Sequence, residues 1–189
     1  MHCKICKQKN FLHPITLLPG SNQIYIETEK RLFQPFAFLF VDIDNFKPYN
    51  DKYGFYQGDL VIKKTAQIIK NALTKTDFIG HIGGDDFIIL STPNKVTNIS
   101  QQICNNFDKQ IIKFYNPLDQ KHKKIITHDR KNNLVEFGIM TISIAIITNE
   151  YKKLTTIGQI SQIAAELKNY AKTKPNGPGS NFVTERRKK

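Results

Sequence analysis

Short apolar runs of strand length alternate along the chain with longer segments whose apolar positions recur at helical spacing. The clearest strand is the run at residues 36–41, Phe-Ala-Phe-Leu-Phe-Val, which ends at an acidic stretch at 42–44. An apolar run of this length that is bounded by charge is typical of a buried strand. Two further apolar runs, at 78–82 and 87–90, flank the sequence Gly-Gly-Asp-Asp at 83–86. They predict a β-hairpin, because glycine supplies the positive φ that tight hairpin turns need.

Other segments carry apolar residues three or four positions apart, which predicts helices with one buried face. They cover about residues 21–32, 45–53, 57–73, 96–114 and 156–171. We expect Ser21 or Asn22 to cap the first helix and Asp44 to cap the second, because short polar side chains accept hydrogen bonds from free backbone N–H groups. Gly54 is expected to end the second helix.

The C-terminal half contains two more predicted strands. Residues 137–147 have partly alternating strand character, and residues 181–183 predict a short final strand. The polar, basic segment 116–133 is expected to form either a solvated loop or an extra hairpin.

The predicted order is helix, strand, two helices, hairpin, helix, strand, helix and short strand. A hairpin makes part of the sheet antiparallel, so the chain is predicted to be α+β rather than doubly wound α/β. The βααββαβ core resembles the split-βαβ arrangement of ferredoxin-like folds, with an antiparallel-containing sheet flanked by helices. We expect residues 21–189 to form this domain and residues 1–20 to form an N-terminal arm. Cys3 and Cys6 have the spacing of half a zinc site, but no second pair follows in the sequence, which favours a short mobile arm.

Composition narrows the class of protein. The 189 residues are 40% hydrophobic and 11% aromatic, which is typical of a globular domain. No apolar run approaches the roughly 18 residues of a membrane span, and we expect no signal peptide because the N-terminus is polar. Three cysteines do not indicate a disulfide framework, so a cytoplasmic location is expected. The net charge of +12 reflects either a compositional bias or attraction to a phosphate-bearing partner.

Carboxylates follow the first predicted strand and occupy the tip of the predicted hairpin. If the two strands are neighbours in the sheet, Asp42 and Asp85 meet at one edge. Carboxylates gathered on a rigid edge are what a hard divalent cation requires. The alternative is that an acidic group here only caps a helix, and we accept this for Asp44. For Asp42 and Asp85 the metal site is favoured, because the two like charges would otherwise lie together without a counter-ion.

Several motifs follow one another in a fixed order along the chain. They are Val41-Asp42-Ile43-Asp44-Asn45-Phe46-Lys47, Asn50-Asp51, Gly58-Asp59 and Gly83-Gly84-Asp85-Asp86-Phe87. Together they resemble the GGDEF family of diguanylate cyclases. Residues 15–20 resemble the family's opening turn and residues 171–172 its last motif, so the likeness covers nearly the whole chain. It implies a fold similar to the palm of nucleotidyl cyclases and polymerases. It also implies an enzyme that condenses two GTP molecules into cyclic di-GMP in bacterial second-messenger signalling.

The resemblance implies which residues carry the reaction. Asp42, the carbonyl of Ile43, and Asp85 would hold Mg²⁺ or Mn²⁺. Asp85, Asp86 and Lys47 would carry the catalytic step, in which a 3′-hydroxyl attacks an α-phosphate. In such transfers, positioning and charge neutralisation supply most of the catalysis.

The resemblance also implies which residues bind the substrate. Lys47, Lys172 and the backbone N–H groups of Asn45 and Phe46 would contact phosphates. Asn50 and Asp59 would select guanine, because a carboxylate can accept from the guanine N1–H, which adenine lacks. An alternative for Asp59 is that it only caps the helix that follows.

Five positions depart from the family's pattern. Asp86 stands for a Glu, Phe55 for a frequent His, His13 for an Asp, and Thr74 for the Arg of a product-binding Arg-x-x-Asp. The phosphate-binding Arg of the family is missing near Ser180.

Two functions stay open on these grounds. One is an active cyclase that works as a homodimer, each copy supplying one GTP. The other is a non-catalytic descendant that binds GTP or another guanine nucleotide as a regulatory or dimerisation module. An upstream sensory or signalling domain is an expected partner. Nucleic-acid binding is not expected, because basic and aromatic residues are not interleaved as base stacking requires.

Overall fold

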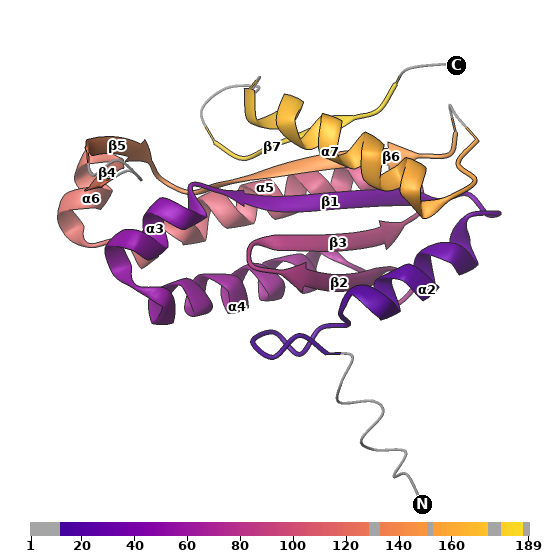
Figure 1. Ribbon diagram of the computed structural model, residues 1–189, viewed down its shortest axis with the longest axis horizontal. Coiled ribbons are helices and arrows are strands. Elements are labelled where there is room, and N and C mark those ends of the chain that lie inside the picture. Colours follow the sequence, from indigo (N-terminus) through magenta and orange to yellow (C-terminus); the bar gives the residue numbers. More distant parts are fainter. Residues whose placement is uncertain (1–11, 129–132, 151–152, 174–178, 187–189) are drawn as a thin grey trace, which may run out of the picture.

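A five-stranded sheet forms the centre of the computed structural model, which describes residues 12–128, 133–150, 153–173 and 179–186 (Figure 1). The strand order is β2-β3-β1-β6-β7. The strands are β1 (Ala37–Asp44), β2 (Phe78–Gly83), β3 (Asp86–Ser91), β6 (Thr141–Thr148) and β7 (Asn181–Thr184). All neighbours pair antiparallel except β6 and β7, which are parallel. The predicted α+β class with an antiparallel-containing sheet is therefore confirmed.

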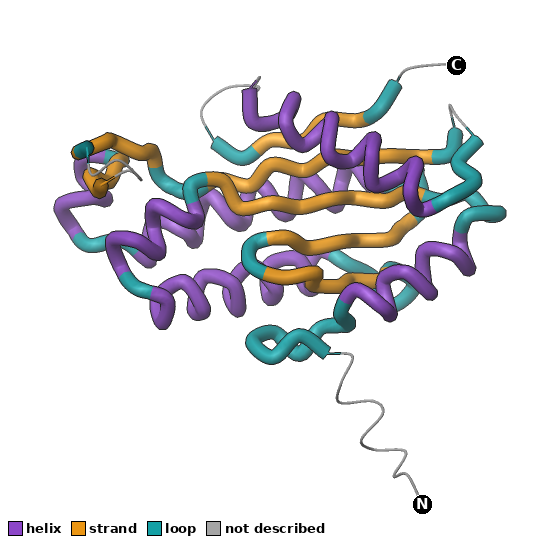
Figure 2. Tube along the Cα trace, in the orientation of Figure 1, coloured by secondary structure: helices purple, strands orange, loops and turns teal. Residues whose placement is uncertain are grey.

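Helices cover both faces of this sheet (Figure 2). They are α2 (Ser21–Arg31), α3 (Phe46–Tyr53), α4 (Phe55–Ala72), α5 (Val96–Ile111, continued by a 3₁₀ turn, Ile112–Phe114) and α7 (Ile157–Thr173). In Figure 1, α7 crosses in front of β6 and β1, while α5 runs behind them.

Each face of β1 belongs to a different core, because successive residues of a strand point to opposite sides. Leu39, Val41 and Ile43 pack in the core that also contains the apolar residues of α3, α4 and α5. Phe38 and Phe40 face the other core, formed with α2 and α7. A strand covered on both faces explains why the run at residues 36–41 is continuously apolar rather than alternating.

Three predicted helix caps were wrong. The residue before α2 is Gly20, so neither Ser21 nor Asn22 caps that helix. The residue before α3 is Asn45, in the left-handed region at φ 59°, and not Asp44. Helix α4 begins at Phe55, which places Asp59 inside the helix and rules out a capping role for it.

The segment after α5 forms a small subdomain rather than a solvated loop. It consists of α6 (Pro117–His122) and a two-stranded antiparallel sheet of β4 (Lys124–His128) and β5 (Leu134–Gly138). The extra hairpin, the second of the two expected alternatives, is thus confirmed. Buried Asp119 ties the subdomain to α3 through an ion pair with Lys52 (2.7 Å) and a hydrogen bond from Tyr53.

The predicted strand at 137–147 was wrong in its first part. Phe137 belongs to β5, and β6 begins only at Thr141. The chain changes sheets at Met140, whose N–H donates to the Tyr115 hydroxyl at 2.8 Å. A hydrogen bond to a side chain 25 residues earlier is invisible to a local pattern.

Residues 12–20 lie against β2. Leu12 and Pro19 form an antiparallel bridge, Leu18 is buried, and the Pro19 carbonyl accepts from the His81 N–H at 2.9 Å. The proposed domain boundary after residue 20 stays a prediction, and the Cys3–Cys6 pair lies outside the described residues. Among the helices of the described residues, none is both long and apolar enough to cross a bilayer.

Candidate metal and nucleotide site

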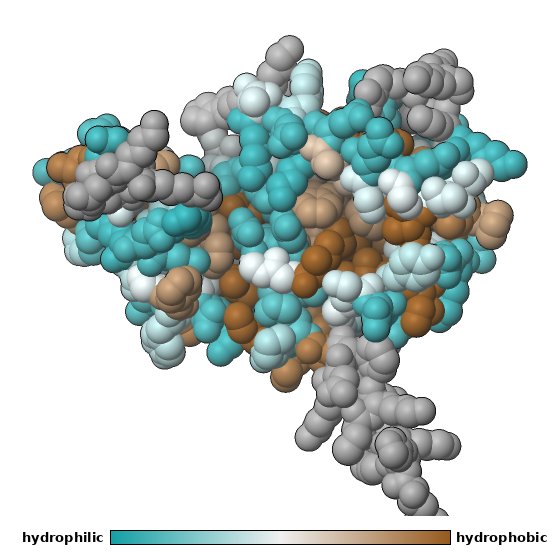
Figure 3. All heavy atoms as spheres, in the orientation of Figure 1, coloured by the Kyte–Doolittle hydropathy of each residue, from teal (hydrophilic) through white to brown (hydrophobic). Residues whose placement is uncertain are grey.

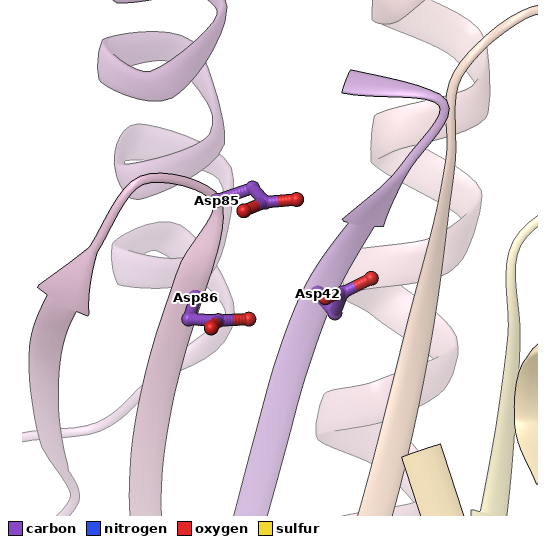
Figure 4. Close-up of side chains that lie close together, drawn as sticks. All are labelled: Asp42, Asp85 and Asp86. Atoms are coloured by element: carbon purple, nitrogen blue, oxygen red, sulfur yellow. The ribbon is translucent and has the colours of Figure 1, made fainter. Parts of the chain in front are cut away.

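Three carboxylates converge where β1 ends and β3 begins. Asp42 of β1 lies directly opposite Asp86 of β3 in the antiparallel register. Asp85 and Asp86 extend from the hairpin toward β1 (Figure 4). One oxygen of each of the three carboxylates lies within 4.8 Å of the others. The strands that carry Asp42 and Asp85 are therefore neighbours, as the prediction of a shared site required.

Burial disfavours the charged form of the carboxylates in this acidic cluster (Asp42, Asp85 and Asp86). Asp42 is only 2% exposed. Burial is the main reason why the pKa of Asp85 is raised, and it also raises the pKa of Asp86 to about 6. Burial also raises the pKa of Asp44, two residues after Asp42 in β1. Like charges in a low-dielectric site require counter-charges or a metal ion.

Two lysines of α7 supply counter-charge. Lys168 Nζ lies 2.6 Å from Asp42 Oδ1 and 3.0 Å from Asp86 Oδ1. Lys172 Nζ lies 2.5 Å from Asp42 Oδ2 and 3.7 Å from Asp44 Oδ1. The sequence placed Lys172 in the site but not Lys168. The only local signal for Lys168 was its i,i+4 spacing from Lys172, which puts both on one helix face.

The carboxylate oxygens still have unused capacity. Within the described part of the chain, buried Asp42 Oδ2 and Asp44 Oδ1 have no partner other than Lys172, whose Nζ lies 2.5 Å and 3.7 Å from them. The other oxygen of Asp44 accepts from the hydroxyls of Thr141 (2.9 Å) and Ser143 (2.7 Å). A set of clustered hard oxygens with open lone pairs fits the ligand preference of Mg²⁺ or Mn²⁺.

The predicted phosphate contacts other than Lys172 lie just beyond the end of β1. Lys47 Nζ pairs with Asp51 at 2.6 Å on the surface of α3, and its side chain is 63% exposed. An exposed i,i+4 pair is worth little, so this ammonium is free to exchange partners. Phe46 is buried at the first position of α3, and the Asn45 amide donates to the Gly138 carbonyl at 3.3 Å. Ile43, beside Asp42 in β1, is almost fully buried.

Asn50 of α3 packs against the part of α4 that carries Asp59. Gly58, the residue before Asp59, has no room for a Cβ, because that atom would overlap the Asn50 amide oxygen. Among the described residues, this Asn50 Oδ1 is buried and has no hydrogen-bond partner. A buried amide acceptor without a partner is a group that a donor of a bound ligand can satisfy. Phe55, at the start of α4, is 81% exposed.

Sequence reasoning missed a buried histidine that joins the opening turn to the hairpin. His81 is fully buried, and its ring stacks on Phe87 (4.2 Å between centroids) and lies 3.6 Å from the ring of His13. Its Nε2–H can only donate to the Gly84 carbonyl at 3.0 Å, so Nδ1 accepts from the Thr16 hydroxyl at 3.0 Å. Both ring nitrogens are hydrogen-bonded in the neutral form of the ring. His81 therefore positions the turn that precedes Asp85.

Acidification should destabilise the fold through His81. Burial lowers the pKa of His81 to about 4, whereas an unfolded histidine titrates near 6.5. The unfolded chain thus binds more protons below pH 6.5, and stability is lost as pH falls toward 4. Between pH 7 and 5, the wild type is expected to lose about 1–2 kcal/mol more unfolding free energy than His81→Phe. Denaturant unfolding at both pH values measures this difference.

His81→Phe keeps an aromatic ring in the stack while removing the titrating group. The raised pKa values of Asp44, Asp85 and Asp86 act in the opposite direction, but they are present in both proteins. If the wild type and His81→Phe lose equal unfolding free energy between pH 7 and 5, His81 is not the group responsible.

On the face of the sheet that α2 and α7 cover, an apolar groove opens between these two helices (Figure 3). Its volume is about 290 Å³, and Phe38, Phe40, Ile82 and Ile88 form much of its floor. Lys168 lines the groove at the side of the acidic cluster. The groove gives the aliphatic stem of this lysine an apolar environment while its ammonium reaches the carboxylates.

The chain matches the family described as diguanylate cyclase, GGDEF domain, over residues 21–174. It is 34% identical over 111 residues to the uncharacterized protein YhcK of Bacillus subtilis, covering 51% of this chain and 31% of that protein. It is 36% identical over 81 residues to a diguanylate cyclase of Vibrio cholerae, covering 41% of this chain and 25% of that protein. The chain spans less than a third of the length of either relative.

Solved structures resemble the whole fold. The GGDEF domain of PA1120 from Pseudomonas aeruginosa has a TM-score of 0.67 at 21% identity, with 92% of this chain and 93% of that chain covered. Vibrio cholerae LapD, a larger chain solved bound to c-di-GMP, has a TM-score of 0.70 at 15% identity, with 96% and 38% covered. At these identities the likeness establishes the fold alone.

Proposed function

The chain belongs to the GGDEF domain family of diguanylate cyclases, and from this premise we propose that it joins two GTP molecules into cyclic di-GMP and releases two pyrophosphates. The observation that carries the proposal is the meeting of Asp42, Asp85 and Asp86 beneath two lysines of α7. Such a site combines acidic oxygens for a cation with ammonium groups for a triphosphate. Both are what phosphoryl and nucleotidyl transfer need.

Asp42, Asp85 and the Ile43 carbonyl would hold Mg²⁺ or Mn²⁺. When bound, such an ion offsets charge on the triphosphate and lowers the pKa of the attacking 3′-hydroxyl. Asp86 lies opposite Asp42 and keeps a carboxylate in the cluster despite being one methylene shorter than the Glu of the family. It would set the charge of the site and orient Lys168, its partner at 3.0 Å.

The phosphates would be bound by cationic and backbone groups around the end of β1. Lys172 already pairs with Asp42 and its side chain is 39% exposed, so its ammonium can turn from Asp42 to a phosphate oxygen. Lys47 would reach the triphosphate from α3, and the N–H groups of Asn45 and Phe46 would donate at the start of that helix.

Guanine would be selected by Asn50 and Asp59. Asp59 would accept from the N1–H and exocyclic amine of guanine, and the buried Asn50 oxygen would gain the donor that it lacks among the described residues. ATP offers no N1–H, so it would leave the carboxylate unpaired and bind more weakly.

A second candidate function is a non-catalytic module that binds a guanine nucleotide. The observation that favours it is that Lys168 and Lys172 already neutralise Asp42, as a site without metal would need. In either case we propose that the domain works beside a second copy and an upstream sensory or signalling domain, in the cytoplasm, without binding nucleic acid.

The direct test is to incubate purified protein with GTP and Mg²⁺ or Mn²⁺ and to identify the product by mass. Cyclic di-GMP with pyrophosphate is expected. GTP binding without product in a forced dimer would select the non-catalytic module instead.

Feedback by the product at the Thr74–Asp77 surface is expected to be weak. The Asp77 carboxylate is used internally, because it accepts from the Ser91 hydroxyl (2.7 Å) and the Thr74 N–H (2.8 Å) and pairs with Lys95 (3.5 Å). Thr74 offers no bidentate fork to a phosphate or guanine. We therefore expect no sub-micromolar cyclic di-GMP binding at this surface by calorimetry.

Thr74→Arg is the matched gain-of-function variant. It restores the fork and is expected to strengthen cyclic di-GMP binding at least about tenfold. Sub-micromolar binding by the wild type that disappears on Asp77→Ala would contradict the prediction.

A further inference from the structure

Lys168 bridges two of the three carboxylates of the acidic cluster, one on β1 and one on β3. Its ammonium contacts Asp42 Oδ1 at 2.6 Å and Asp86 Oδ1 at 3.0 Å, and these carboxylates belong to the cluster whose oxygens lie within 4.8 Å of one another. The same Nζ lies 4.8 Å from the centre of the Phe40 ring, a distance at which the ring face attracts a cation. Lys168 is thus held from two strands at once.

From this geometry we propose that Lys168 is a built-in counter-ion of the acidic cluster, which a divalent cation must displace in order to bind. The inference rests on the metal site of the proposed function. An ammonium and a divalent ion cannot share the same carboxylate oxygens at these distances, because their like charges repel strongly in a partly buried site. Metal binding is therefore a cation exchange in this domain.

Displacement is feasible without unfolding α7. The helix is anchored in the core by Ile160, Ile163 and Ala164, independently of Lys168. The Lys168 side chain is 25% exposed, so its long stem can swing the ammonium toward solvent. The released ammonium would then stand beside the nucleotide, where a triphosphate is a better partner than water.

The exchange predicts weak binding of the metal alone and stronger binding together with the nucleotide. Without GTP, the ion gains the carboxylates but forces Lys168 into water. With GTP, the ammonium gains phosphate oxygens, so the two ligands assist each other and the coupling is reciprocal.

The test measures Mn²⁺ binding to the nucleotide-free domain by electron paramagnetic resonance and by calorimetry. Lys168→Met keeps the apolar stem in the groove and removes the charge. We expect it to bind Mn²⁺ at least about tenfold more tightly than the wild type, because a competing charge is lost. Lys63→Met, which removes the same charge from an exposed position of α4, is the matched control and is expected to bind Mn²⁺ like the wild type.

Further variants separate this inference from the metal site itself. Asp85→Asn should lose Mn²⁺ binding in both the wild-type and the Lys168→Met background. If Lys168→Met binds Mn²⁺ no more tightly than the wild type while Asp85→Asn loses it, the counter-ion role is overturned and the metal site stands. If none of these proteins binds Mn²⁺ with or without GTP, the metal site and the counter-ion role of Lys168 are both overturned. Lys168→Gln, judged by the same criterion, replaces Lys168→Met if that variant does not give a cooperative unfolding transition.

Discussion

Asp85→Asn is expected to lower cyclic di-GMP formation to background, by on the order of 10²–10³-fold or more. Losses of this size follow when one preorganised electrostatic group is removed from an active site. Asp85 lies at the tip of the β2–β3 turn, and its carboxylate points toward β1, the strand that carries Asp42 (Figure 4). Asparagine keeps the shape but removes the charge that a divalent cation needs. Product formation is followed by mass or chromatography with GTP and Mg²⁺ or Mn²⁺.

The same substitution should leave the fold intact. Burial raises the pKa of Asp85, which means that the folded environment disfavours its charge. The free energy of unfolding is therefore expected to be unchanged or slightly higher in Asp85→Asn. Glu136→Gln is the control, because it removes one carboxylate from an exposed ion pair in the β4–β5 subdomain. Unchanged product formation in Asp85→Asn would rule the metal assignment out.

Fusion to a dimerising coiled coil is expected to raise cyclic di-GMP formation per chain by roughly 10²–10³-fold at micromolar protein, because a short linker provides an effective concentration in the millimolar range. Two phosphodiester bonds form between two nucleotides, and each proposed site holds one GTP. The two sites must therefore face each other with two-fold symmetry, so that each 3′-hydroxyl meets the other α-phosphate.

Isolated domains are expected to associate only weakly with one another. The net charge of +12 makes two copies repel, so we expect a mostly monomeric domain whose turnover rises faster than linearly with protein concentration. Analytical ultracentrifugation and a concentration series of the rate measure both properties. Added salt screens the repulsion and should raise the rate at fixed protein concentration.

The fused dimer also separates the two candidate functions. A fusion that carries Asp85→Asn is the control and should make no product while remaining dimeric. If the wild-type fusion binds GTP with metal but still makes no cyclic di-GMP, the cyclase proposal fails and the regulatory module takes its place.

The order of the elements followed from the sequence because the signals are local. A continuous apolar run ending at Asp42 identified a doubly covered strand, and Gly83 and Gly84 identified the hairpin. Gly84 indeed lies in the left-handed region at φ 59°, where a side chain would be strained. The sequence allowed Asp42 and Asp85 to share one edge of the sheet if the two strands were neighbours, and the antiparallel pairing of β1 with β3 meets that condition.

The caps and the start of β6 could not be predicted in the same way. Asp44 has a good capping side chain, but Thr141 and Ser143 of β6, 97 and 99 residues away, offer it two hydroxyl donors. Met140 leaves the strand pattern because Tyr115 accepts its N–H. Long-range partners outweigh the local preference in both cases, and their positions depend on the assembled sheet.

The sequence by itself determined where the ionisable residues fall along the elements: acidic residues at a strand end and a hairpin tip, and basic residues on the last helix. Only the tertiary structure decided that Lys168, 82 residues from Asp86, is the side chain that meets these carboxylates, and that His81 positions the turn before Asp85. The physical reason is that a charge pattern fixes the face of a helix but not the strand end over which that face comes to lie. That placement is set by the packing of α7 on β6 and β1, to which residues far apart in the chain contribute together.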